Sequence, residues 1–298
     1  MQLWKLPNIV IAPETIFWIF GFPVTNTLFC TWLTIIFLAV LFFFGTRRRD
    51  LIPSGLQNFL ELIVEFLLNL VEGVSGKVKG RRFFPFVATF FIFIVAANLI
   101  DVLPGVDTVG TINPHEHLAN QPFLGFLLYG DDSNKIIPWL RPPTTDLNLT
   151  LAMALVSVVV TQIFGFLILG TGNHINKYFN FKALFTRGPI GIVEFVVGIL
   201  EIISEIGRLI SFSFRLFGNI FAGSILLAVF AFLVPVFVTI IFIPFELFVA
   251  AIQAFVFAFL TLLFLELGTT SHNHPEEDVH DAVKEYEENK AKTAVAAH

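Results

Sequence analysis

The sequence contains little charge and only one cysteine, and both shortages narrow its fold class. Charged residues make up 14% of the 298 positions, whereas hydrophobic residues make up 56%. A soluble domain of this length needs more charge to cover its surface, so the composition indicates an integral membrane protein. The net charge of −5 comes without a basic patch, which argues against nucleic acid as a partner. The single Cys30 excludes a disulfide within the chain.

The sequence also lacks the motifs of an enzyme that acts on a soluble substrate. It has no glycine-rich phosphate loop and no nucleophile elbow. Its histidines lack metal-ligand spacing, so we expect neither a metal site nor a cofactor. No internal repeat of the kind found in inverted-repeat transporters is visible. Residues 1–25 lack a signal-peptide cleavage pattern, so we interpret them as an N-terminal segment outside the membrane.

Long apolar runs predict an all-α membrane domain over residues 26–267. About 20 apolar residues are enough to span the hydrocarbon core of a bilayer. Five crossings are expected, at residues 26–45, 83–102, 146–169, 190–232 and 240–267. The run 190–232 exceeds one perpendicular crossing, so it predicts a long tilted helix that forms a hairpin with the last helix. Thr145 or Asp146 is a suitable N-cap for the third crossing.

Residues 53–73 predict one amphipathic helix on the cytoplasmic surface. Their polar side chains recur every three or four positions, and leucines and an isoleucine occupy the other side. Basic residues flank the segment at both ends, so both ends favour the same side of the membrane.

The basic clusters 47–49, 77–82 and 177–187 indicate the orientation of the chain. By the positive-inside rule they are cytoplasmic, which places the N-terminus and the loop 106–143 outside. The polar, acidic tail 268–298 is then a solvated cytoplasmic segment. A bacterial inner membrane fits this pattern, with an energy-transducing organelle membrane as the alternative.

Two polar stripes lie within the last two crossings. Thr239, Glu246 and Gln253 are spaced by seven residues and therefore share one helical face. An arginine at the centre of a membrane helix costs roughly 2.5–3.5 kcal/mol on insertion scales, so Arg215 indicates a function. The two stripes can line a common aqueous path. The stripe of the penultimate helix comprises Ser204, Arg208, Ser211, Arg215 and Asn219, spaced by 4, 3, 4 and 4 residues. Glu201, seven residues before Arg208, continues this stripe toward the cytoplasm.

Structural roles remain open for several of these residues. Hydroxyl and amide side chains, including those of Ser204 and Asn98, could simply hold helices together by hydrogen bonds. Arg208 and its neighbour Glu205 could extend to the membrane interface. Arg215 and Glu246 could form a structural ion pair, and Asp101 could lie at the interface.

The segment Arg215-Leu216-Phe217-Gly218-Asn219, followed by Ala222-Gly223, resembles the signature of the a subunit of F-type ATP synthase. The resemblance covers about residues 20–267. Further matching segments are Asn26-Thr27, Asn98 to Asp101 before Leu103-Pro104, Thr145 to Asn148, and Gln253 to Phe255. It implies a non-catalytic, ion-translocating stator subunit that works with a ring of c subunits, peripheral-stalk b subunits and the remainder of the synthase.

The resemblance also implies a role for each site residue. Arg215 would face the ion-binding carboxylates of the c ring and separate two half-channels. Glu201 and Ser204 would belong to the cytoplasmic half-channel. Many relatives carry Glu or His where this chain has Ser224, so Glu246 would carry the titratable function alone. The half-channel open to the other side would contain Asn219, Glu246, Gln253 and, at its periphery, Asp101.

Protons are the expected ion, with sodium as the alternative. Two other functions compete with this reading. A secondary transporter would need repeat symmetry and interrupted helices, and a structural anchor would tolerate the loss of Arg215. The segment from Arg215 to Gly223 favours the synthase subunit over both.

Overall fold

The computed structural model describes residues 12–47, 55–100, 109–112, 136–170, 189–233 and 237–270. The predictions for Asp101, most of the loop 106–143, the basic cluster 177–187 and the tail beyond Thr270 lie outside these ranges. The chain divides into two compact units. Unit 1 comprises residues 1–161 and 203–266, and unit 2 comprises residues 162–202 and 267–298.

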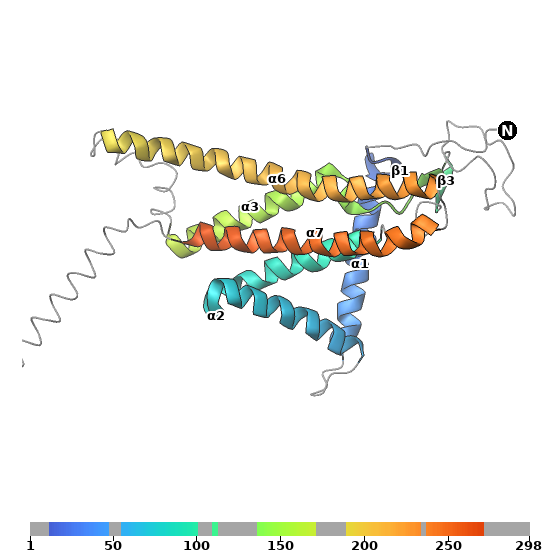
Figure 1. Ribbon diagram of the computed structural model, residues 1–298, viewed down its shortest axis with the longest axis horizontal. Helices are drawn as coiled ribbons and strands as arrows, with labels where there is room; N and C mark the ends of the chain where they lie inside the picture. Colours follow the sequence, from blue (N-terminus) through green and yellow to red (C-terminus); the bar gives the residue numbers. More distant parts are fainter. Residues whose placement is uncertain are drawn as a thin grey trace, which may run out of the picture. The chain divides into compact units, whose positions relative to one another are not determined.

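The described chain is predominantly helical, as the sequence predicts (Figure 1). Four of these helices are long and apolar enough to cross a membrane: α1 (Asn26–Arg47), α2 (Leu56–Leu99), α3 (Leu147–Leu169) and α7 (Phe237–Thr269). The fifth predicted crossing corresponds to α6 (Pro189–Leu233), which carries the polar stripe. It is not among the four helices that are long and apolar enough to cross a membrane. The all-α membrane class is therefore confirmed.

Helices α6 and α7 form the predicted hairpin. Phe230 near the end of α6 stacks on Phe242 near the start of α7, with ring centroids 4.6 Å apart. The helices contain 45 and 33 residues. At about 1.5 Å per residue, each exceeds the roughly 30 Å of the hydrocarbon core. Within unit 1, α7 (orange-red) also runs across the direction of α1 (blue) in Figure 1. A membrane crossed by both helices therefore requires at least one of them to tilt.

Helix α2 joins two elements that the sequence predicts as separate. The element Leu56–Leu99 consists of two helical legs that meet at a sharp bend at Gly76, and the legs correspond to the amphipathic segment 53–73 and the crossing 83–102. Gly76 has φ 71° and ψ 167°, a conformation that is essentially restricted to glycine. The two legs approach so closely that a Cβ on Gly80 would lie 3.1 Å from the Cα of Glu72. After the bend, Arg81 forms an ion pair with Glu72 of the first leg at 2.9 Å.

Side-chain caps begin two of the helices. Thr25 Oγ1 accepts a hydrogen bond from the Leu28 amide at the start of α1, at 3.3 Å. At the start of α3, Asp146 Oδ1 accepts one from the Asn148 amide at 2.9 Å. Each cap satisfies an amide that has no partner within its own helix. Of the two candidates that the sequence offers for α3, Asp146 is the N-cap, and a 3-10 turn (η3, Pro143–Thr145) precedes it.

Two small sheets were not predicted. Strands β1 (Thr15–Ile19) and β2 (Phe22–Thr25) form a hairpin directly before α1. Strands β3 (Gly110–Ile112) and β4 (Ile136–Pro138) form a second antiparallel pair. Trp139 follows β4, and its ring contacts Phe29 of α1 at 6.2 Å between centroids. The second sheet is thereby packed against the N-terminal end of α1.

The bend at Gly76 gives a first prediction. A side chain at Gly76 would be forced into a strained conformation, so Gly76→Ala should destabilise the protein by about 1–3 kcal/mol. Gly73→Ala is the matched control, because Gly73 is helical and a Cβ there meets nothing within 4 Å. Thermal unfolding of the purified variants measures the difference. Equal melting temperatures for the two variants would contradict a glycine-specific bend.

Candidate functional site

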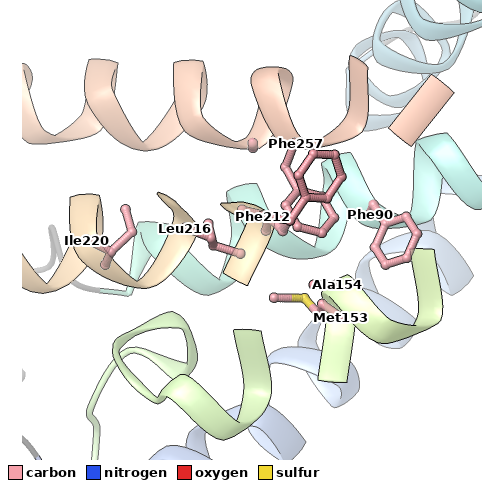
Figure 2. Packing of buried hydrophobic residues seen from close by; sticks show 9 residues of the cluster. Phe90, Met153, Ala154, Phe212, Leu216, Ile220 and Phe257 are labelled. Atoms are coloured by element: carbon pink, nitrogen blue, oxygen red, sulfur yellow. The ribbon is translucent and has the colours of Figure 1, made fainter. Parts of the chain in front are cut away.

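Helix α6 has a buried face in unit 1. Phe212, Leu216 and Ile220 are buried in the main hydrophobic cluster with residues of α2, α3 and α7. Figure 2 shows these three side chains in a row, with Phe257 of α7 beside Phe212. The rings of Phe212 and Phe257 have centroids 5.2 Å apart. This packing fixes the rotation of α6 about its own axis.

The side of α6 next to this buried face presents the predicted polar stripe. Ser204, Ser211, Arg215 and Asn219 are all exposed on it. The Arg215 guanidinium donates a hydrogen bond to Ser211 Oγ at 3.4 Å, one turn away. Arg215 and Glu246 are both described, and no ion pair joins them. The alternative of a structural ion pair between these two residues is therefore wrong.

Glu246 lies on α7 and is buried against α6. Its side chain is only 3% exposed, and its Oε1 has no hydrogen-bond partner among the described residues. The carboxylate packs directly on Gly223, where a Cβ would overlap it and lie 2.7 Å from its Cδ. The sequence predicts that Gly223 permits close helix approach. The structure shows that the group in closest approach is a carboxylate.

A hydrogen bond joins the two stripes one turn away from Gly223. Asn219 Nδ2 donates to Gln253 Oε1 at 2.6 Å, and Gln253 is 3% exposed. Glu246 and Gln253 therefore share the buried face of α7, as their spacing predicts. The side chain of Thr239, the third member of that stripe, lies outside the description. Along α6, the site thus runs from the exposed guanidinium through a pair of amides to a buried carboxylate.

The other predicted site residues are Ser224, which directly follows Gly223, and Ser204, Glu201 and Asp101. Ser224 donates to the Ile220 carbonyl of its own helix at 3.0 Å. Ser204 is exposed on α6 in unit 1. Glu201 is half-buried and belongs to unit 2. Asp101 is outside the described residues.

Arg208 leaves the exposed stripe and turns toward α7. Its guanidinium lies 4.0 Å from the ring centroid of Phe264 and 3.4 Å from Glu205. The side chains of Arg208 and Glu205 are only 18% and 14% exposed. The alternative that both extend outward is therefore not what the structure shows, because the stacking and the ion pair hold them against the protein.

A second buried polar cluster was not predicted as a site. Thr27 of α1 donates to Asp146 Oδ2 at 2.9 Å, although the two residues are 119 positions apart. Thr144 donates to Asn98 Oδ1 of α2, and Thr150 and Ser213 bond at 3.3 Å between α3 and α6. The sequence signal was present for half of the cluster, because three of the segments that resemble the family contain Thr27, Asn98 and Asp146. Spacing along a single chain could not show that they converge.

The contact between Gly223 and Glu246 gives a second prediction. Gly223→Ala should destabilise the α6–α7 hairpin by about 1–3 kcal/mol, because the new methyl group overlaps the carboxylate. Gly218→Ala on the same helix is the control, since a Cβ there meets nothing within 4 Å. Thermal unfolding should also show that Gly223→Ala costs less in a Glu246→Ala background. A cost that is unchanged in that background would contradict the packing.

Comparison with known proteins identifies the family of this chain. The profile of the family described as ATP synthase A chain matches residues 28–266. ATP synthase subunit a of Moorella thermoacetica is 30% identical over 255 residues, covering 86% of this chain and 95% of that protein. Subunit a of Trichlorobacter lovleyi is 31% identical, over 84% and 89% of the two chains. A sodium ion specific subunit a from Propionigenium modestum is 28% identical, over 83% and 75%. The chain belongs to the ATP synthase a subunit family.

Proposed function

We propose that this chain performs the ion-translocating stator role of its family with Arg215 facing the c ring. The supporting observation is that the guanidinium is exposed on a helix whose other face is buried. Neighbouring Ile210 and Phe214 are also exposed, at 48% and 56%, so large apolar side chains border the exposed stripe. A charge on such a surface in a bilayer needs a partner of opposite charge. The ionised carboxylate of a passing c subunit provides that partner.

The route from one side of the membrane runs through Glu246, Gln253 and Asn219. Glu246 is the buried titratable group of this route, and the Asn219–Gln253 bond leads from it toward Arg215. The polar cluster around Thr27 and Asp146 extends the polar interior of unit 1 toward the N-terminal ends of α1 and α3. We propose that ions reach Glu246 past this cluster, and that Asp101 lies at its periphery.

The route to the other side contains Ser204 and Glu201. Both precede Arg215 in the sequence of α6, and Ser204 is about three turns before it. Arg215 therefore lies between the two routes. Because a guanidinium does not readily give up its proton, it prevents protons from passing directly from one route to the other.

The ion transfer follows from the cost of burying charge. A bare carboxylate is too costly in hydrocarbon, so each c-ring carboxylate must be neutralised before it leaves the stator. Arg215 favours the ionised form of a c-ring carboxylate. It therefore promotes release of the bound ion when that carboxylate returns to the stator. Each charge that moves down a potential of 100 mV supplies about 2.3 kcal/mol, and this free energy biases the rotation of the c ring in one direction. We propose protons as the ion, because the buried route contains a titratable carboxylate.

The membrane orientation is part of the same proposal. Arg47 ends α1, and Lys79 and Arg81 follow the bend of α2, which supports a cytoplasmic location for these ends. The N-terminus is then outside and the C-terminal tail cytoplasmic, in a bacterial inner membrane. The chain acts as a non-catalytic channel subunit beside the c ring and the peripheral-stalk b subunits, and ATP is made elsewhere in the complex.

Replacing Arg215 tests this proposal directly. In the assembled complex, Arg215→Ala should reduce ATP-driven ion pumping about 100-fold or more, since about 3 kcal/mol of charge stabilisation is lost. Passive ion leakage through the membrane sector should rise in the same vesicles. The control is Arg81→Ala, because Arg81 is 71% exposed and pairs with Glu72 away from the site. Normal coupled pumping by Arg215→Ala would refute the assigned role.

Replacing Glu246 tests the access route. Glu246→Gln keeps the shape that packs on Gly223 but removes the titratable group, so pumping should slow by at least about tenfold. Glu61→Gln is the control, since Glu61 lies on the exposed face of α2 and bonds only a neighbouring turn. Pumping rates across a pH series measure the effect. An unchanged rate and pH profile would remove Glu246 from the route.

A further inference from the structure

The uncharged stretch of the N-terminal region is longer than its membrane helix. No charged residue occurs from Thr15 to Thr46. Helix α1 uses 22 residues, which at about 1.5 Å each already span the roughly 30 Å hydrocarbon core. Residues 15–25 are therefore not needed for the crossing, although they are as free of charge as the helix itself.

These extra residues form the β1–β2 hairpin, and its tip is apolar and exposed. The strands meet at Phe20 and Gly21, whose φ angles of 49° and 83° make a tight two-residue turn. Trp18 is 68% exposed, Phe22 is 63% exposed and Phe20 is fully exposed. An aromatic side chain at a positive φ is uncommon, and here it places a phenyl ring at the point of the hairpin.

The hairpin is attached to the N-terminal end of α1 (Figure 1, blue). The Asn26 amide donates a hydrogen bond to the Glu14 carbonyl at 3.0 Å. Phe17 of β1 meets Phe29 of α1 edge to face, with centroids 6.3 Å apart. The hairpin therefore lies beside the first turn of α1.

We propose that the β1–β2 hairpin is an interfacial anchor whose aromatic tip inserts into the lipid boundary beside the N-terminal end of α1. Its apolar surface continues that of the helix, where Trp32 and Ile36 are also exposed. Aromatic side chains favour this boundary between headgroups and acyl chains. The outer edges of a two-stranded sheet keep unpaired backbone groups, which excludes the centre of the bilayer and fits its polar boundary.

The anchor sets the depth of the polar cluster in the membrane. Asn26 and Thr27 follow β2 directly, and Thr27 donates to Asp146. A hairpin held at the lipid boundary fixes these residues close to the membrane surface. The inference depends on α1 crossing the membrane and does not depend on the roles proposed for Arg215 or Glu246.

Spin labelling of the assembled complex in lipid nanodiscs tests the anchor. A nitroxide is attached to Phe20→Cys in a Cys30→Ser background, and its collisions with oxygen and with a water-soluble nickel chelate are measured. Ala12→Cys is the matched control, because Ala12 is exposed and precedes the charged Glu14. ATP-driven pumping by the same preparations shows that the complex is intact.

A label at position 20 should collide more often with oxygen than with the nickel chelate, and the order should reverse at position 12. Preferential collision with the chelate at position 20 would place the tip in water and overturn the proposal. A label immobilised and protected from both reagents would also overturn it, because protein would then cover the tip, whether residues 1–11 of this chain or another subunit.

Discussion

The burial of one face of α6 determines the direction of Arg215, and the rest of the site depends on it. Phe212, Leu216 and Ile220 pack into the main core, and Arg215, on the side of the helix next to them, is left exposed. An exposed guanidinium is stable in water but costly in a bilayer, where it requires a charged partner. The core thus acts on the proposed function indirectly, because it holds Arg215 on an exposed surface of the chain.

Close packing then places the second charged group where water and lipid do not reach it. Glu246 approaches α6 at a glycine, and the lack of a side chain at Gly223 provides the space for its carboxylate. The neighbouring Asn219–Gln253 bond spans the same two helices. Arg215 and Glu246 therefore remain unpaired with each other although they lie on adjacent helices. In the proposed mechanism, that separation leaves Arg215 available for a passing carboxylate and Glu246 available for a mobile ion.

Much of the fold could be predicted, because apolar length and helical periodicity are local properties. The spans, the long α6 and the cap at Asp146 follow from residues that lie close together in sequence. The bend between the two legs of α2 was not predicted. It brings Gly80 against a turn eight residues earlier, and this contact is visible only in the three-dimensional structure. The β1–β2 hairpin was missed because residues 1–25 were interpreted only as a segment outside the membrane, with no secondary structure assigned to them. The glycine at position 21, following aromatic and β-branched residues, was the available signal.

The sequence by itself determined the membrane class, the polar stripes and the motif around Arg215. These depend on composition and on spacing along single helices. Only the tertiary structure decided which of these groups meet. It joined Asn219 to Gln253 and Thr27 to Asp146, turned Arg208 onto Phe264, and kept Arg215 apart from Glu246. The physical reason is that periodicity specifies the face of a helix, whereas contacts across 34 to 119 residues depend on how separate helices pack.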